Sequence, residues 1–182
     1  RDAQESRGLG DVYKRQGIIR YPVAYESFFM SMIEEKNLKY HNVWEFDYVL
    51  ITSENSQLAK EKEINETVLD KYIEVLHGDN IVPNISATYQ KKNAELNNHS
   101  RHIYVYERGS QFDILSACPD SFMWVSPLPK EILKRYGLVQ RVCHSFKKTN
   151  KDVLIYQSNY RLSHADQMFL DELERVRKEI SE

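Results

Sequence analysis

The stretch HIYVYERGSQFDILSACPDSFMWVSPLPKEILKRYG, residues 102–137, decides the fold class because it alternates two kinds of local structure. His102–Glu107 and Phe122–Ser126 are rich in β-branched and aromatic residues, which is typical of strands. Helices are expected after each strand, over Gly109–Ala117 and Lys130–Tyr136, where apolar residues recur at helical spacing. Strands that alternate with helices favour an α/β fold with largely parallel sheets.

The same alternation continues on both sides of this stretch. Further strands are expected over residues 17–19, 44–53, 72–76, 138–143 and 152–157, and further helices over residues 27–36, 65–72 and 85–96. The C-terminal helix has the clearest signal, since Ser163 and Asp166 have the spacing of a capping box. Its apolar stripe follows at helical spacing, with Phe169, Leu173, Val176 and Ile180. No Gly/Ser linker interrupts the chain, so two lobes would have to share strands that cross between them.

The composition is that of an ordinary globular protein. The 182 residues are 41% hydrophobic and 29% charged, with a formal net charge of −2, so nothing indicates a nucleic-acid-binding surface. No apolar run approaches the length of a membrane span, and we expect a cytoplasmic protein that needs no membrane and no cofactor. Cys118 and Cys143 lack metal-ligand spacing, which favours two reduced thiols.

The first sixteen residues, RDAQESRGLGDVYKRQ, do not look natural. Ser6–Gln16 resembles the translation of a transposase-type sequencing adapter, as in a metagenomic fragment. Segments of this kind are excluded from fold reasoning. We therefore expect residues 1–16 to contribute nothing to the core. The natural part of this sequence would begin near Gly17, and the natural protein would continue upstream of that point.

Several short stretches in the rest of the chain form an ordered set of motifs. Gly17-Ile18-Ile19 is similar to a strand that usually reads D-x-G-I. Tyr48–Ala59, YVLITSENSQLA, is similar to a hydrophobic strand followed by H-P-L-A, with Ser and Gln in place of His and Pro. Ser110–Pro127 has the spacing of a helix and strand that end in G-x-G-I-x-x-x-P, without the glycines, and Gly137–Val139 fits G-L-V. The set resembles the effector-sensing domain of LysR-type bacterial transcription regulators over nearly all of residues 17–182.

The resemblance implies a two-lobed fold like that of a type II periplasmic binding protein. Lobe one, which would be incomplete, would hold residues 17–45 and 127–182, and lobe two residues 46–126, with Trp44–Leu50 and Phe122–Ser126 crossing between them. A small polar or anionic effector would bind between the lobes. DNA would be bound only through a winged helix-turn-helix upstream, in a regulator that works as a homo-oligomer. The rival interpretations are a solute-binding protein for transport and an enzyme on the same scaffold.

Three loops and one strand end are the candidate binding residues. Loops that follow the carboxyl ends of parallel strands are where open α/β sheets bind ligands. The candidates are Arg20 and Tyr21 after the first strand, His77 and Asp79 after the strand over residues 72–76, Glu107, Arg108, Gly109 and Ser110 at a helix start, and Ser126. The alternative is that these are ordinary turns, in which Arg20 pairs with an acid such as Glu26 and Ser110 caps the helix.

The sequence contains no pattern that indicates a catalytic or metal-ligating residue. His99 and His102 are three apart but lie around a polar turn, where solvated side chains are the simpler interpretation. Ser110 lacks the second glycine of a nucleophile elbow, and Cys143 and His144 point to opposite faces if they share a strand. We therefore expect a ligand-binding module and not an enzyme.

Overall fold

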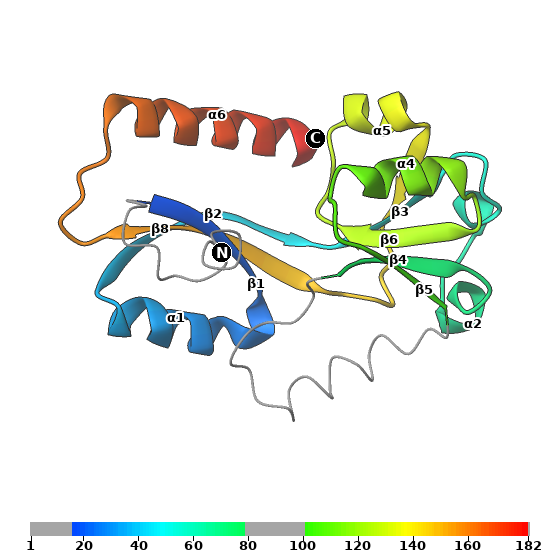
Figure 1. Ribbon diagram of the computed structural model, residues 1–182, viewed down its shortest axis with the longest axis horizontal. Coiled ribbons are helices and arrows are strands. Elements are labelled where there is room, and N and C mark those ends of the chain that lie inside the picture. Colours follow the sequence, from blue (N-terminus) through cyan, green and yellow to red (C-terminus); the bar gives the residue numbers. More distant parts are fainter. Residues whose placement is uncertain (1–15, 79–100, 182) are drawn as a thin grey trace. The chain divides into compact units, whose positions relative to one another are not determined.

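The structure of the chain is a computed structural model, and it describes residues 16–78 and 101–181 (Figure 1). The chain forms two compact units, the first comprising Arg1–Asp47 and Lys148–Glu182 and the second comprising Tyr48–Lys147. The chain therefore passes from one unit to the other twice, after Asp47 and after Lys147. The helix expected over residues 85–96 and the candidate residue Asp79 lie outside the described residues.

Unit 1 contains a three-stranded antiparallel sheet. Its order is β1 (Gln16–Pro22), β8 (Thr149–Gln157) and β2 (Leu38–Asp47), with β8 in the centre. The register of β2 shifts between Asn42 and Trp44, as at a β-bulge. Gln16 belongs to β1 and pairs with Tyr156, so β1 includes the last of the sixteen residues that were expected to contribute nothing to the core.

Two helices cover opposite faces of this sheet (Figure 1). The short η2 (Val23–Tyr25) leads into α1 (Glu26–Glu35), and the core beneath α1 contains Tyr21, Ile33, Val153 and Ile155. On the other face lies α6 (His164–Ser181). Its predicted capping box is confirmed, because the Asp166 N–H donates to the Ser163 hydroxyl at 3.2 Å and the Ser163 N–H donates to the Asp166 carboxylate at 2.6 Å.

Unit 2 contains a five-stranded mixed sheet of order β5-β4-β6-β3-β7. Three neighbouring strands, β5 (His102–Val105), β4 (Ile73–His77) and β6 (Ser121–Val125), are parallel. The strand β3 (Val49–Ser53) runs antiparallel to both β6 and β7 (Leu138–Arg141). The connecting helices are α2 (Glu66–Leu69), α4 (Ser110–Ala117) and α5 (Lys130–Tyr136), with the short η3 (Leu58–Lys60). The predicted α/β class is confirmed, although the parallel pairing lies only in unit 2.

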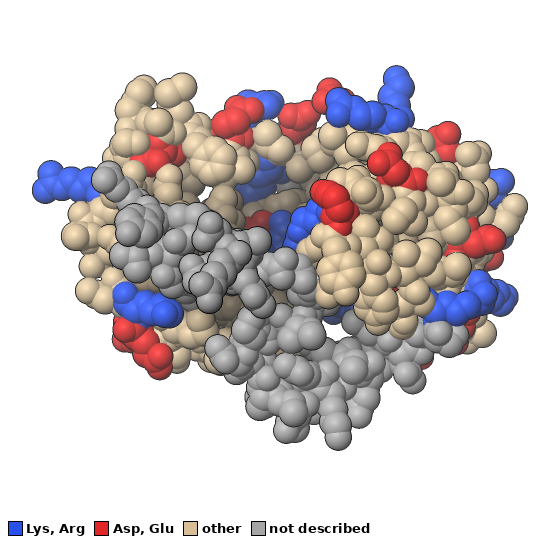
Figure 2. Space-filling model, in the orientation of Figure 1, with Lys and Arg blue, Asp and Glu red and all other residues tan. Residues whose placement is uncertain are grey.

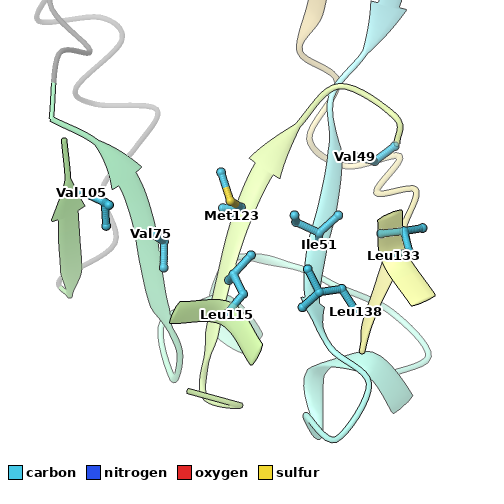
Figure 3. Close-up of a cluster of buried hydrophobic side chains, with 8 residues drawn as sticks. All are labelled: Val49, Ile51, Val75, Val105, Leu115, Met123, Leu133 and Leu138. Carbon is cyan, nitrogen blue, oxygen red and sulfur yellow. The ribbon is translucent and has the colours of Figure 1, made fainter. Parts of the chain in front are cut away.

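Apolar clusters cover both faces of the unit 2 sheet. One packs against α4 and α5 and comprises Val49, Ile51, Val75, Val105, Leu115, Met123, Leu133 and Leu138 (Figure 3). The other lies on the opposite face and comprises Leu50, Leu58, Ile64, Leu69, Tyr72, Phe122 and Cys143. The strand β3 supplies alternate residues to the two clusters and is buried along its whole length. That burial explains its almost continuous apolar sequence.

Two boundaries differ from those expected. The stretch over residues 44–53 is not one strand, because the chain leaves the unit 1 sheet at Asp47 and enters the unit 2 sheet at Val49. The segment over residues 127–147 belongs to unit 2 and not to lobe one, because β7 pairs with β3 from Leu138 to Arg141. The second passage between units therefore follows Lys147, and β6 lies wholly inside unit 2.

Candidate functional site

The topology of unit 2 gathers several candidate residues at one edge of its sheet. Because β4, β5 and β6 are parallel, their last residues, His77, Val105 and Val125, end at the same edge. The antiparallel β3 begins there, since Val49 is the partner of Val125. We call this edge, with the residues that follow each strand end, the carboxyl edge of unit 2. It brings together His77, Glu107, Arg108, Gly109, Ser110 and Ser126 of the residues predicted from sequence.

The imidazole of His77 is held by the neighbouring strand. Its Nδ1 atom lies 2.9 Å from the carbonyl oxygen of Val105. A carbonyl oxygen only accepts hydrogen bonds, so Nδ1 must carry the proton. In the neutral ring Nε2 is then an acceptor, and in the protonated ring it is a second donor. The half-buried His77 therefore has a fixed tautomer at the carboxyl edge.

An aromatic residue that the sequence analysis did not select also lies at this edge. The ring of Tyr106 packs directly on the backbone of Gly78, since a Cβ atom added to Gly78 would be 2.4 Å from a ring carbon. The Gly78 N–H donates to the Val105 carbonyl at 3.0 Å, which holds the glycine beside β5. Tyr106 is nevertheless 72% exposed, so it presents an aromatic surface at the edge. A glycine directly after a predicted strand was the only signal of this close approach.

The start of α4 is not capped as the sequence suggests. Its N-cap residue is Gly109, and Ser110 makes no capping hydrogen bond. The Glu107 carboxylate occupies this position instead, because its Oε1 accepts from the Gly109 N–H at 3.1 Å. Negative charge is favoured at a helix N-terminus, where backbone N–H groups lack helical partners. Glu107 is therefore an exposed carboxylate bound at the helix start.

Gln111 is a second residue that the sequence analysis missed. It is 6% exposed, and its Nε2 has no hydrogen-bond partner within the described chain. Gln111 and Leu115 are the buried residues of α4, four apart, and so share the helix face that packs on the sheet. Buried amide groups are rarely left unpaired in folded proteins. No sequence pattern distinguishes this glutamine from an exposed one.

The two candidates in unit 1 are held inside that unit, Arg20 by hydrogen bonds and Tyr21 by packing, and the buried Tyr21 hydroxyl has no hydrogen-bond partner in the described chain. The Arg20 guanidinium donates from Nε and Nη2 to the two carboxylate oxygens of Asp152, both at 2.7 Å, and lies 4.7 Å from the ring centroid of Phe46. Its acidic partner is therefore Asp152 across the strand and not Glu26. Tyr21 is fully buried, and its ring stacks on Phe29 at a centroid distance of 4.6 Å.

The charged groups next to Tyr21 also pair with one another. Lys151 lies with its Nζ 2.6 Å from Glu26 and 3.5 Å from Glu45. The hydrogen bond to Glu26 raises the pKa of Lys151. Burial, followed by the charge of Glu26, raises the pKa of the Tyr21 phenol. Tyr21 therefore belongs to the core of unit 1, and Lys151 is fully charged at neutral pH.

Further titratable groups with buried atoms in the described part of the chain include Cys143 and the pair Glu74 and His102. Burial raises the pKa of the Cys143 thiol, which suppresses the nucleophilic thiolate. Glu74 and His102 form a close buried pair, with Oε2 and Nε2 3.5 Å apart, but His102 opens β5 at the opposite end from the carboxyl edge. Among residues 16–78 and 101–181, no three His, Cys, Asp or Glu side chains gather so as to hold a metal ion. No helix in these residues is long and apolar enough to cross a membrane.

Comparison with known proteins identifies the fold. No protein-family model matches the sequence, and no curated protein matches it. Solved structures do match. The effector-binding domain of QuiR in complex with shikimate is 18% identical with a TM-score of 0.57, and the match covers 90% of this chain and 72% of that one. The regulatory domain of CcmR from Synechocystis PCC6803 in complex with 2-PG is 17% identical with a TM-score of 0.54, covering 91% and 74%.

A longer protein aligns in the same way. A full-length OxyR variant from Pseudomonas aeruginosa is 8% identical with a TM-score of 0.57, and the match covers 87% of this chain and 52% of that protein. Further matches include the regulatory domain of the LysR-family regulator MetR from N. meningitidis. The chain therefore has the two-unit α/β fold of the effector-binding domains of LysR-family transcription regulators.

Proposed function

We propose that this chain is the effector-binding domain of a bacterial LysR-type transcription regulator, and that it binds a small polar or anionic metabolite. The observation that carries the proposal is the carboxyl edge of unit 2, where three parallel strands end beside the start of α4. This is the position at which open α/β sheets bind ligands. Two proteins of the same fold were solved with small molecules bound, shikimate in QuiR and 2-PG in CcmR.

In this proposal the ligand contacts come from His77, Tyr106, Ser126 and the segment Glu107–Ser110. His77 and Ser126 are half-buried, whereas Tyr106 and Glu107 are exposed, so the edge presents both accessible and partly enclosed side chains. Arg20 stays a candidate on unit 1, because 40% of its side chain is exposed while it holds Asp152. Tyr21 contributes through packing instead of through its phenol, which is fully buried.

DNA binding would come from a winged helix-turn-helix outside this chain, in a homo-oligomeric regulator. The chain itself carries a net charge of −2, and phosphate neutralisation needs clustered Lys and Arg. Among the described residues on the visible face, Figure 2 shows Lys and Arg interspersed with Asp and Glu. The structures matched here are regulators, which favours this function over a solute-binding protein for transport.

The test is a thermal-shift screen of small metabolites on the chain, with variants at the carboxyl edge. We expect a hit whose stabilisation is weakened by His77→Ala or Ser110→Ala, because both residues lie at the proposed site. Asp120→Asn is the matched control, since Asp120 is exposed and precedes β6, at the opposite end of that strand. Arg20→Ala tests the contribution of unit 1.

A ligand that binds unchanged to all three alanine variants would contradict this site.

A second experiment tests whether DNA is bound by a separate domain. We expect no salt-dependent binding of the chain to duplex DNA, measured by fluorescence anisotropy, and tight binding there would refute the assignment of DNA contacts to a separate domain.

A further inference from the structure

The strongest unexplained feature of the carboxyl edge is the amide of Gln111. Gln111 is only 6% exposed, and its Nε2 donor is unpaired within the described chain. A buried donor without an acceptor is destabilising, so it indicates a group that the fold leaves for something else. Elsewhere in unit 2 a buried donor does find a protein acceptor, since the Thr52 hydroxyl donates to the Ser121 carbonyl at 2.8 Å.

Gln111 lies in the first turn of α4, and because the Cα–Cβ bonds of a helix tilt toward its N-terminus, its side chain extends toward the helix start. Leu115 follows one helical turn later on the same face and packs in the cluster with Ile51 and Met123 (Figure 3). The helix runs back from the carboxyl edge, because it connects the end of β5 with the start of the parallel β6. Gln111 therefore lies one turn, about 5 Å, nearer the carboxyl edge than Leu115, between the first turn of α4 and the sheet.

The backbone N–H of Gly109, at the start of α4, already donates to a carboxylate of the chain itself. Glu107 Oε1 accepts from the Gly109 N–H at 3.1 Å, and no side chain caps α4 in the usual way. The contact spans only two residues and is exposed to solvent, so it can exchange with another anion. The helix start therefore receives a carboxylate, and the buried amide donor lies within the same turn.

We propose that Gln111 is a specificity-determining residue that donates to a carboxylate oxygen of the ligand, and that Glu107 competes with that carboxylate for the start of α4. The inference rests on the proposed function and narrows its ligand to a small carboxylate. The Gln111 amide would donate to an acceptor oxygen of the ligand. A site built to hydrogen-bond one group discriminates strongly against analogues that lack that group. Glu107 carries the same charge as the ligand and accepts from the same backbone N–H, so binding displaces it.

The test uses formate, the smallest carboxylate, so that ligand shape does not decide the result. Formate is titrated into the ¹⁵N-labelled chain at constant ionic strength maintained with sodium chloride, and formamide is titrated as the neutral analogue. We expect saturable shifts of the Gln111 side-chain amide and of the Gly109 and Ser110 backbone amides with formate, and a response at least ten-fold weaker with formamide. Absence of a saturable formate response at these groups would overturn the proposal.

Variants separate the two roles. Gln111→Leu should abolish the saturable response at Gly109, whereas Gln57→Leu, an exposed glutamine of unit 2 that precedes η3, should leave it unchanged. Glu107→Gln should tighten formate binding about three- to ten-fold, because the competing charge is removed. Gln111→Glu is a second variant of nearly equal size, and it should also abolish binding since it replaces the donor by an acceptor. A saturable response that persists in either Gln111 variant overturns the proposal.

The outcomes also distinguish this inference from the proposed function. A metabolite hit in the thermal-shift screen that is unaffected by Gln111→Leu would defeat the inference and leave the sensing function standing. Formate binding that depends on Gln111, with no metabolite found, would support the inference and count against the sensing function.

Discussion

Arg20 in unit 1 and Gln111 in unit 2 differ in how their polar groups are paired. In unit 1 the candidate residue Arg20 pairs with Asp152 through two hydrogen bonds, and Lys151 is held by Glu26 and Glu45. In unit 2 the buried donor of Gln111 has no partner in the described chain, and the start of α4 depends on an exposed carboxylate. A loop after a strand can therefore be internally satisfied or left open to a ligand. The buried, unpaired amide in the first turn of α4 gives a chemical reason to expect a ligand acceptor there, whereas Arg20 already has Asp152 as its partner.

The largest change in stability is expected from truncating a core residue of α4. Leu115→Ala should lower the free energy of unfolding by about 2–5 kcal/mol, because the side chain is fully buried in the unit 2 cluster and its removal leaves a cavity. Urea unfolding followed by circular dichroism measures the change. A loss well below 1 kcal/mol would show that α4 is loosely packed and that Gln111 is not held as described.

Removing the acidic partner of Arg20 tests how much the Arg20–Asp152 pair stabilises unit 1. Asp152→Ala should cost about 1–3 kcal/mol, since Asp152 is buried and accepts two charge-assisted hydrogen bonds. The value is kept low because 40% of the Arg20 side chain is exposed and partly screened by solvent. Glu172→Ala is the matched control.

Glu172 also pairs with an arginine, Arg175, through two side-chain hydrogen bonds, but both residues are exposed on α6. We expect no measurable loss of stability for the control by the same urea unfolding. Equal effects of Asp152→Ala and Glu172→Ala would remove the distinction between a buried pair and a surface pair.

An acid-dependent effect should appear at the start of α6 in unit 1. Hydrogen bonds from the Tyr160 hydroxyl, and then from Ser163, lower the pKa of Asp166 from 3.8 to about 2. A carboxyl whose pKa is depressed by folding contributes stability above its unfolded pKa, and this contribution is lost as pH falls toward the folded value. The loss should therefore occur between about pH 4 and pH 2. Asp166→Asn should flatten this part of the stability–pH curve, and an unchanged slope would contradict the assignment.

The smallest effect is the most informative about unit 2. Gln111→Leu should change the free energy of unfolding by less than about 1 kcal/mol, or increase it, because the Nε2 donor makes no hydrogen bond in the described chain and its desolvation cost is removed. Urea unfolding of this variant beside Gln57→Leu checks the expectation. A loss of 2 kcal/mol or more, which is about the cost of breaking a buried hydrogen bond, would show that the amide has a structural partner.

Much of the fold could be predicted because it depends on local patterns. The strands and helices of residues 102–137 occur where the alternation of apolar and turn residues places them, and the capping box of α6 forms as predicted. The positions of His77, Gly109 and Ser126 after parallel strands follow from the same alternation. Their gathering at one edge could be expected, because parallel strands end on the same side of a sheet.

The boundary between the units could not be predicted in this way. Residues 44–53 have one continuous β pattern, yet the chain changes sheets at Tyr48. The strand β7 has no feature of its own that selects β3 as its partner, and pairing places it in unit 2. Sheet membership is decided by hydrogen bonds between strands that are distant in sequence, and local propensity does not encode such bonds.

By itself, then, the sequence determined the α/β class, most of the elements, the cap of α6 and the strand ends that carry the candidate site. The tertiary structure decided which polar groups are satisfied. Arg20 meets Asp152, 132 residues away, whereas Gln111 meets no acceptor in the described chain. Glu107 instead of Ser110 occupies the start of α4, although both are nearby in sequence. The physical reason is that hydrogen bonding depends on distances of about 3 Å between atoms, which only the packed chain defines.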